Sequence, residues 1–347
     1  MGSPTDRRGI RRTVAGMDLA ALPTWYLPTV FALLGAVFGS FSAVVVDRTV
    51  RQEDISGRSG CANCGAPIPW YLNIPLAAWP ALRGRAACCG APIPAYLWLC
   101  ELASAVGFVA AATFAETWTE AVAWAAYVVF AVVIGGIDAI TRLVYLRWVV
   151  VFGGAAWLAA AGDAVLSGEP ERILSGLAAS AAVIVALEAI GMLVRLVLGR
   201  PGIGKGDTYI VAVTAGVPAL LAGNWIFGVW GFVAGWLLGG LGGVIKAAAT
   251  PEIREAMRGL WWLRAGAVGV LAGAALGAAV GLSVGIGMYW PSILPMAGAG
   301  LLGGVGLGAV RRLFGRSSVG VKMPFGPFLV AGPLLLWIVA TLASRGA

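Results

Sequence analysis

The chain has 347 residues, of which 60% are hydrophobic and only 12% are charged, and its mean hydropathy is +0.89. Because soluble domains carry roughly 25% charged residues, this composition excludes an ordinary soluble domain and indicates an integral membrane protein. The chain contains no histidine. That excludes Ser-His-Asp and Cys-His catalysis and metal binding through imidazole, and it leaves carboxylates and cysteines as the candidate chemical groups.

The net charge of +8 comes from basic residues that lie in short loops between apolar runs rather than in one patch. The preference of Lys and Arg for the cytoplasmic side of a membrane accounts for this distribution. Membrane lipid is therefore the expected surrounding of the chain, and nucleic acid is not an expected partner.

Apolar runs of roughly 20 residues, the length that spans a bilayer, predict an all-α fold: a polytopic transmembrane helical bundle with about ten crossings. In chain order the expected crossings are 26–46, 97–115, 121–140, 146–162, 173–199, 208–223, 225–249, 262–287, 290–310 and 326–343. Residues 1–25 form an N-terminal segment in this scheme. A start at Met17 is the hypothesis that removes an arginine cluster from the outer side of the membrane.

The loops between these crossings alternate in charge. The basic loops are 47–96, 141–147, 195–206, 246–264 and 311–323, whereas the intervening loops are acidic or uncharged. We therefore expect the basic loops to face the cytoplasm. The first of them is long and polar, and it predicts a small cytoplasmic domain between the first and second crossings.

This domain contains two pairs of cysteines, Cys61 with Cys64 and Cys88 with Cys89. A CxxC motif followed about two dozen residues later by a second pair is typical of a metal or redox knuckle in a reducing compartment. Two interpretations stay open. The four thiolates bind a tetrahedral zinc ion, or the domain is free of metal, because the second pair is adjacent where a CxxC spacing is expected.

Two aspartates lie at the edges of apolar runs. Asp138 follows Gly135-Gly136-Ile137, and Asp207 ends the run Gly202-Ile203-Gly204-Lys205-Gly206-Asp207. An ionisable side chain at membrane depth indicates a functional site, and an aspartic protease needs two carboxylates. The structural alternatives are a helix N-cap for Asp207 and an i,i+4 ion pair with Arg142 for Asp138. The alternating glycines favour a backbone that approaches an extended peptide closely.

Six sequence motifs follow one another in a fixed order. They are Phe38-Gly39-Ser40-Phe41, the cysteine segment from Cys61 to Cys89, Glu101, Asp138, Gly204-Lys205-Gly206-Asp207, and Pro324-Phe325-Gly326-Pro327-Phe328-Leu329. In this order they resemble the type IV prepilin peptidases, also known as prepilin leader peptidase/N-methyltransferases, which are membrane aspartic proteases of the Gly-x-Gly-Asp class. The resemblance extends from about residue 35 to residue 335.

The resemblance implies a role for each motif. Asp138 and Asp207 would be catalytic, substrate would contact Gly204, Lys205, Gly206 and Glu101, and metal would bind Cys61, Cys64, Cys88 and Cys89. The expected activity is cleavage of the leader peptide from type IV prepilin-like or type II secretion pseudopilin precursors, at the cytoplasmic face of a bacterial inner membrane. Proteolysis needs no cofactor. Zinc would bind in the cysteine domain, and S-adenosylmethionine would serve if the new N-terminus is methylated.

The chain also departs from the family pattern. Val144-Tyr145-Leu146 stands in place of Ile-Pro-Asp, and Thr208-Tyr209 follows the second aspartate where a lysine is usual. Within this resemblance, 97–250 forms the core protease domain, 251–315 is an inserted pair of crossings, and 316–347 carries the last motif and the last crossing. Two alternatives remain: a non-enzymatic transporter or scaffold that uses its intramembrane carboxylates, and a degenerate member that binds prepilins without cutting them.

Overall fold

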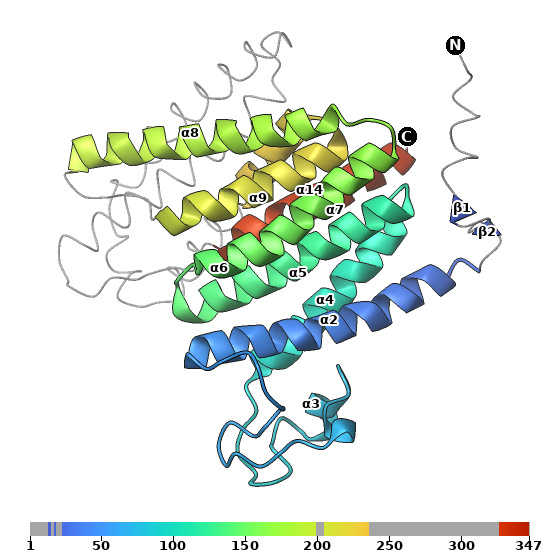
Figure 1. Cartoon of the computed structure of the whole chain (residues 1–347), viewed down its shortest axis with the longest axis vertical. Helices are drawn as coiled ribbons and strands as arrows, with labels where there is room; N and C mark the ends of the chain where they lie inside the picture. The colour runs from blue at the N-terminus through green and yellow to red at the C-terminus, as the bar shows by residue number, and fades with distance from the viewer. Residues whose placement is uncertain (1–12, 15–16, 19–22, 199–204, 236–325, 347) are drawn as a thin grey trace, which may run out of the picture.

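The structure is a computed structural model that describes residues 13–14, 17–18, 23–198, 205–235 and 326–346. In these residues the protein is a bundle of α-helices with a small lobe at one end (Figure 1), which confirms the predicted fold class. Two short strands, β1 (Thr13–Val14) and β2 (Met17–Asp18), pair antiparallel before the first helix. The expected crossings 262–287 and 290–310, and the expected insertion 251–315, lie outside the described residues.

A helix lies at each expected crossing within the described residues, although the apolar helices Thr208–Ala222 and Leu329–Leu342 are shorter than the other spans and the expected crossing 225–249 is described only to Gly235. The described helices are α2 (Tyr26–Arg51), η2 (Trp70–Leu72), α3 (Ala78–Ala81), α4 (Ala95–Phe114), α5 (Trp118–Thr141), α6 (Leu146–Trp148), the π-helical turn η3 (Val149–Gly153), α7 (Gly154–Leu166), α8 (Arg172–Leu198), α9 (Lys205–Ala222), a helical segment Trp225–Gly235, and α14 (Gly326–Gly346). Five spans are long and apolar enough to cross a membrane by length and composition. They are α2, α4, α5, the continuous stretch from α6 to α7, and most of α8.

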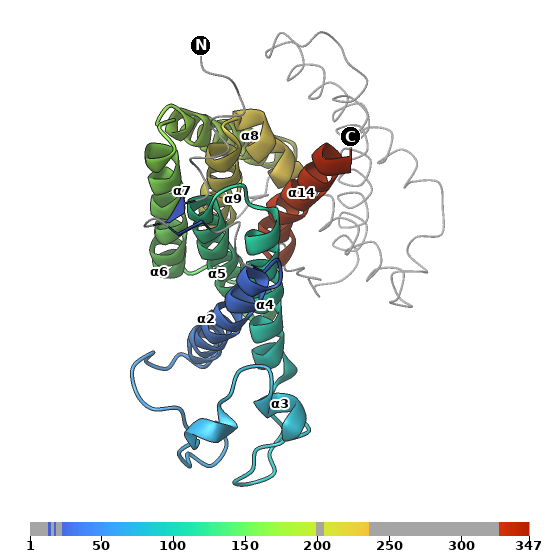
Figure 2. The ribbon, with the colours of Figure 1, turned by 90° about the vertical axis from the view of Figure 1, so that its right-hand side faces the viewer.

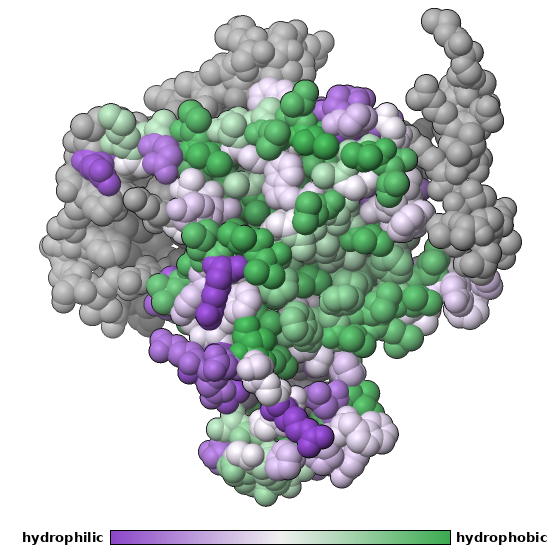
Figure 3. Space-filling model, in the orientation of Figure 1, coloured by the Kyte–Doolittle hydropathy of each residue, from purple (hydrophilic) through white to green (hydrophobic). Residues whose placement is uncertain are grey.

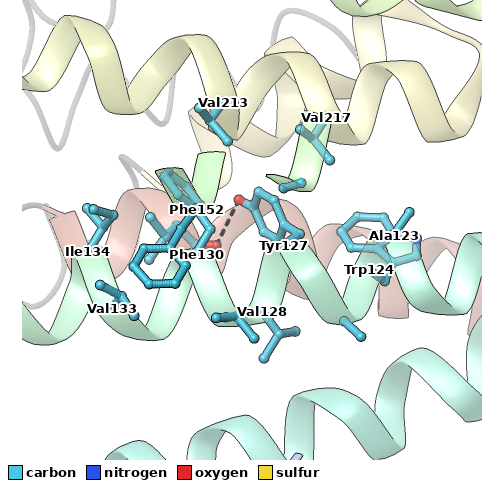
Figure 4. Packing of buried hydrophobic residues seen from close by; sticks show 14 of the residues in the cluster. Ala123, Trp124, Tyr127, Val128, Phe130, Val133, Ile134, Phe152, Val213 and Val217 are labelled. Atoms are coloured by element: carbon cyan, nitrogen blue, oxygen red, sulfur yellow. Dashed lines mark hydrogen bonds between the residues drawn. The ribbon is translucent and has the colours of Figure 1, made fainter. Parts of the chain in front are cut away.

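Helix α5 lies at the centre of the bundle. Its apolar window is 67% buried, against 28–39% for the other four spans. Trp124, Tyr127 and Phe130 are completely buried along it. Figure 4 shows Val213 and Val217 of α9 pointing toward the layer that holds Phe130 and Tyr127. The position of α5 therefore decides where its last turn, with Asp138, lies relative to the other helices.

Both ends of α5 are fixed by local hydrogen bonds. At the start, the Thr117 hydroxyl accepts a hydrogen bond from the Glu120 amide (3.1 Å), and the Glu120 carboxylate accepts one from the Glu116 amide (2.7 Å). This arrangement resembles a capping box. At the end, Arg142 takes a left-handed conformation (φ 58°) and its amide donates to the Asp138 carbonyl (2.9 Å). The helix therefore stops one turn after Asp138.

Helix α14 packs on α5 through aromatic side chains and one backbone group. The Tyr127 hydroxyl donates to the Val330 carbonyl (3.0 Å), and the rings of Trp124 and Trp337 stack with centroids 4.3 Å apart. Figure 4 shows the Tyr127 hydrogen bond as a dashed line. The last described helix is thereby held against the middle of the bundle, although it is far from α5 in the sequence.

The surface of the bundle is apolar, as expected of helices that face lipid. Figure 3 shows hydrophobic residues over much of the visible bundle face and polar residues mainly toward its ends and on the lobe. Leu158 of α7 is 76% exposed and Leu174 of α8 is 69% exposed. Exposed apolar surface of this extent is typical of a membrane-facing or binding surface.

The cysteine-containing lobe begins and ends slightly inside the expected range 47–96. Helix α2 continues to Arg51, and α4 already starts at Ala95. Figure 2 shows the lobe, which includes α3, beyond one end of α2 and α4. The helices extend because polar groups there have protein partners: the Trp148 indole donates to the buried Thr49 hydroxyl (3.0 Å), and the Tyr96 hydroxyl donates to the Asp47 carboxylate (2.7 Å).

Candidate functional site

The lobe contains two loops with the same backbone hydrogen bonds, 25 residues apart in the sequence. In the first loop, the Cys61 amide donates to the Ala66 carbonyl and the Gly65 amide donates to the Cys61 carbonyl. In the second loop, the corresponding bonds join Ala86 with Ala91 and Gly90 with Ala86. Gly65 and Gly90 both have positive φ angles, 72° and 70°, which glycine adopts without steric cost.

The structural equivalence shows how the second cysteine pair differs from the first. Cys64 corresponds to Cys89, whereas the position of Cys61 is occupied by Ala86. Cys88 corresponds instead to Asn63, whose side-chain amide donates to the Cys89 sulfur (3.7 Å). The second loop has therefore lost one cysteine of the CxxC spacing and carries another cysteine two positions later.

The four cysteine sulfurs nevertheless converge. The Sγ atoms of Cys64 and Cys88 are 3.3 Å apart, those of Cys61 and Cys89 are 3.7 Å apart, and all four lie within 4.8 Å of one another. A tetrahedral zinc ion with bonds of about 2.3 Å needs sulfur separations of about 3.8 Å. The cluster fits such an ion after shifts of about 1 Å or less, and its donor set of four sulfurs suits zinc.

The cysteines of this cluster differ in acidity. The pKa of Cys61 is lowered to about 6, chiefly because its sulfur accepts hydrogen bonds from the backbone amides of Cys64 and Asn63. The pKa of Cys88 is raised to about 12, chiefly because its thiol is hydrogen-bonded to the sulfurs of Cys64 and Cys61. These hydrogen bonds thus favour the thiolate form at Cys61 and the thiol form at Cys88. Binding of a metal ion through all four sulfurs would release the Cys88 proton.

Asp138 lies in the last turn of α5, where the helix contacts its neighbours closely. Asp138 is 7% exposed. On one side, a Cβ atom at Gly135 would lie 3.3 Å from the Cα of Pro327, in the motif that starts α14. On another side, a Cβ atom at Gly136 would lie 3.0 Å from Val46 of α2. The two glycines before Asp138 therefore let α2 and α14 approach the turn that carries the aspartate.

Asp207 lies in the first turn of α9, which begins at Lys205. A Cβ atom at Gly206 would lie 2.8 Å from the Cβ of Val144. Because Val144 is in the short connection that follows α5, the end of α5 and the start of α9 are adjacent. Gly204 and the side chains of Lys205 and Asp207 lie outside the described part of the structure. The expected approach of the two carboxyl groups stays a prediction.

Glu101 lies in the second turn of α4, near the lobe. One carboxylate oxygen accepts a hydrogen bond from the Leu76 amide (2.7 Å), and Ser40 also hydrogen-bonds this side chain. Gly39 makes room for it, since a Cβ atom there would lie 2.6 Å from the Glu101 Cα. The motif around Gly39 thus contacts Glu101 directly, which the linear sequence did not reveal.

Sequence reasoning missed two parts of this site. Val144 lies in the segment where the chain departs from the family pattern, and it contacts Gly206 of the glycine motif. The contact between Gly135 and Pro327 brings the C-terminal motif to the first aspartate. The glycines indicated that helices approach closely, because glycine permits such contacts, but a glycine in the sequence does not indicate which helix it contacts.

Taken together, the apolar helices, the cysteine lobe and the two adjacent aspartate-bearing helix ends define a polytopic helical membrane protein with a candidate site at one end of its bundle. The family model of the Bacterial Peptidase A24 N-terminal domain matches residues 33–115, which include α2, the lobe and α4. This match and those to curated proteins confirm the similarity to the type IV prepilin peptidases.

Among curated proteins, the chain is 42% identical over 74 residues to a prepilin leader peptidase/N-methyltransferase of Myxococcus xanthus (strain DK1622), covering 20% of this chain and 22% of that protein. It is 39% identical over 64 residues to a protein of the same description from Vibrio cholerae serotype O1, and this match covers 16% of this chain and 25% of that protein. Both matches span about a quarter of the relative's length or less. A third relative, from Klebsiella pneumoniae, is 29% identical over 189 residues, covering 52% of this chain and 80% of that protein. No solved structure matches the chain.

Proposed function

We propose that the chain is a membrane aspartic endopeptidase that removes the leader peptide from type IV prepilin-like or type II secretion pseudopilin precursors. The observation that carries this proposal is the contact between Val144 and Gly206, which joins the helix end with Asp138 to the helix start with Asp207. The description of the relatives as prepilin leader peptidase/N-methyltransferases supports the substrate class.

The proposed chemistry is hydrolysis of one peptide bond by two carboxyl groups that share a proton. Two nearby carboxylates do not easily ionise together, so one of Asp138 and Asp207 is a carboxylate while the other is protonated. The carboxylate removes a proton from the attacking water while the protonated group donates its proton to the carbonyl oxygen, which gives a tetrahedral diol. The first group, now protonated, donates to the leaving amine as the C–N bond breaks, and the second group takes back a proton from a diol hydroxyl as the new carboxyl end forms. The glycines of the Gly204-Lys205-Gly206 segment let the substrate backbone lie beside these groups.

The cysteine cluster is proposed to bind a zinc ion through Cys61, Cys64, Cys88 and Cys89. The convergence of four sulfurs within 4.8 Å supports it. Such a closed tetrathiolate site stabilises a small domain and supplies no group to the hydrolysis. N-methylation of the new N-terminus with S-adenosylmethionine is a second candidate activity, supported by the description of the relatives as prepilin leader peptidase/N-methyltransferases.

The proposed location is the bacterial inner membrane, with the cysteine lobe and both aspartates on the cytoplasmic side. The helix ends that lie together at the lobe carry Arg48, Arg51, Arg142 and Arg147, whereas the opposite end carries Glu116, Asp163, Glu169 and Glu171 with Arg172. We name these the basic end and the acidic end of the bundle. Positive residues favour the cytoplasmic side.

The experiment that tests the function compares Asp138→Asn and Asp207→Asn with the wild type. Each amide keeps the shape of the side chain but cannot act as a general base, so precursor cleavage in membranes should fall by at least about 100-fold. The control is Glu171→Gln, an exposed residue at the acidic end, which should cleave normally. Cleavage near the wild-type rate in either asparagine variant would remove that aspartate from the active site.

The same experiment separates the proposal from its alternatives. A chain that binds precursor without cutting it, or a transporter that uses its carboxylates for proton or cation relay, would show no cleavage in the wild type either. A single-turnover assay with purified chain and a prepilin-like peptide therefore decides between an enzyme and a binding protein. Wild-type cleavage that depends on both aspartates supports the endopeptidase.

A further inference from the structure

Leu76 adopts an unusual backbone conformation in the lobe. Its φ angle is +63°, in the left-handed region that residues with a Cβ atom rarely adopt. Leu76 follows Pro75, which has no backbone N–H group, so the Leu76 amide is the nearest backbone donor at this point of the chain. A residue held in this region normally needs support from the surrounding structure.

That support comes from two side chains of α4. The Leu76 amide donates to the Glu101 carboxylate (2.7 Å), and the Leu76 carbonyl accepts from the Trp98 indole (3.1 Å). Both polar backbone groups of one strained residue are therefore satisfied by the helix that carries Glu101. A hydrogen bond to a charged carboxylate is also stronger than one between neutral groups.

The contact extends from Leu76 to the second cysteine loop. The Trp98 ring stacks on Trp79, with ring centroids 5.7 Å apart. The Trp79 indole donates to the Ile93 carbonyl (3.1 Å), and the Ile93 amide donates to the Gly84 carbonyl (2.7 Å). Gly84 and Ile93 flank the loop with Cys88 and Cys89. This loop is thus linked through Trp79 to Trp98, the same side chain that donates to the Leu76 carbonyl.

On its other side, Glu101 contacts the bundle itself. Ser40 of α2 hydrogen-bonds the carboxylate, and Gly39 lies against the Glu101 backbone. The preceding residue, Cys100, faces the turn before Asp138, since its sulfur lies 3.6 Å from a Cβ atom placed at Gly136. Glu101 is therefore located where α2, α4 and the lobe meet, and its neighbour contacts the helix that carries the first aspartate.

We infer that Glu101 is a positioning residue that fastens the cysteine lobe to the bundle by holding the backbone of Leu76. The family resemblance assigns the same carboxylate to substrate contact, but one of its oxygens already accepts the Leu76 amide. The inference rests on the proposed function only for its consequence: a lobe that is held in place presents a fixed surface beside the active site to the precursor.

Hydrogen exchange tests the contact without any assay of activity. In the wild-type protein in detergent, the Leu76 amide should be protected. In Glu101→Ala it should exchange at least about tenfold faster, because the amide has lost its acceptor. Glu101→Gln keeps an acceptor oxygen and should restore most of the protection. The matched control is the Cys61 amide, which donates to Ala66 within the lobe (2.8 Å) and should not change.

The outcomes distinguish a local contact from general unfolding. Faster exchange at Leu76 alone supports the inference, whereas faster exchange at both Leu76 and Cys61, or unchanged exchange at Leu76, overturns it. If Glu101→Ala does not fold, Trp98→Phe serves as the second variant. It removes the indole donor to the Leu76 carbonyl, keeps an aromatic ring beside Trp79, and should raise exchange at Leu76 by a smaller factor.

Activity then distinguishes positioning from substrate contact. If the endopeptidase proposal holds, Glu101→Ala should raise the KM for precursor by about tenfold and leave kcat within a few-fold. Glu101→Gln should behave like the wild type. Loss of activity with normal protection of Leu76 would mean that the carboxylate binds substrate, and it would overturn the inference. Absence of cleavage in the wild type would contradict only the proposed function, because the exchange result is independent of it.

Discussion

Cys88 and Asn63 occupy equivalent positions in the two cysteine loops, yet only Cys88 contributes a sulfur to the cluster. The position that corresponds to Cys61 is Ala86. A ligand that moves by two residues in a tight loop can still point into the cluster, because the loop reverses direction within those residues. The lost cysteine at position 86 is thus compatible with a complete set of four sulfurs.

This ligand shift gives a prediction at the residue scale. Cys88→Ser should lower zinc affinity by at least about 100-fold, because a thiolate ligand is replaced by a hydroxyl. The double variant Ala86→Cys with Cys88→Ser restores the CxxC spacing of the second loop and should recover binding. Metal analysis of purified protein, and the sulfur-to-cobalt absorption of Co²⁺-loaded protein, measure the effect.

The control for this prediction is Cys100→Ser, since Cys100 is buried in α4 and does not belong to the cluster. It should bind zinc like the wild type. Equal zinc content in the wild type and Cys88→Ser would remove Cys88 from the ligand set. A wild type without stoichiometric zinc would contradict the metal site as a whole.

At the scale of helices, small residues decide how closely the elements approach. Gly35 and Gly39 lie one turn apart on α2, and Cβ atoms there would lie 2.8 Å and 2.6 Å from backbone atoms of α4. In lipid, where apolar burial does not drive helix association, such close contact contributes much of the attraction between helices. The crossing of α2 and α4 also fixes Ser40 beside Glu101.

We therefore expect Gly39→Ala to destabilise the protein by about 1–3 kcal/mol, because the added methyl group forces two backbones apart. Thermal unfolding in detergent micelles measures the change. Gly162→Ala in α7 is the matched control, since a Cβ atom there meets no atom within 4 Å. Alanine is the better helix former by about 1 kcal/mol, so this variant should unfold at the same or a higher temperature.

The two variants together distinguish a specific helix contact from a general effect of replacing glycine. A Gly39→Ala protein as stable as Gly162→Ala would show that α2 and α4 do not depend on this crossing. Reduced stability in both variants would instead point to a general requirement for glycine in the helices. Only a selective effect at Gly39 agrees with the observed contact.

The boundaries of the elements were largely readable from the sequence, but their irregularities were not. The expected crossing 146–162 corresponds to α6, η3 and α7, and the π-helical turn inside it was not expected. That turn ends at Gly153, where a Cβ atom would lie 2.7 Å from Val213 of α9. The pattern of apolar residues reports burial along one helix, whereas such a turn depends on contact with another helix.

At the scale of the whole molecule, charge separates the two ends of the bundle. The acidic end is held together by Asp163, which is 2% exposed, accepts hydrogen bonds from Thr117 and Thr119, and pairs with Arg172 (3.7 Å). These contacts link α5, α7 and α8. A buried carboxylate with such partners is retained because removal of one partner would leave a charge uncompensated.

The proposed orientation of the chain in the membrane rests on this charge asymmetry and can be measured. Once a chelator has removed bound metal, a membrane-impermeant maleimide should label the exposed Cys64, Cys88 and Cys89 in inverted membrane vesicles and not in intact spheroplasts. In a variant without the lobe cysteines, Glu171→Cys at the acidic end should show the reverse pattern. Labelling of the lobe cysteines from outside would invert the topology and contradict cleavage at the cytoplasmic face.

The sequence by itself determined the class of the protein. Its apolar runs specify membrane helices, because each must satisfy its backbone hydrogen bonds internally and match the thickness of the bilayer. The order of its motifs also indicated the resemblance to one family, and the spacing of the cysteines predicted that Cys61, Cys64 and Cys89 converge. These properties are local in the chain, or are periodic along it, and so they can be read without coordinates.

Only the tertiary structure decided which segments meet. Cys88 takes part in the cluster because of the loop geometry, Gly206 contacts Val144, Gly135 contacts Pro327, and Glu101 holds Leu76. Each contact joins residues whose types are individually common in membrane helices and loops. Their partners depend on how the helices cross, and crossing is set by the summed packing of many side chains, which no single motif encodes.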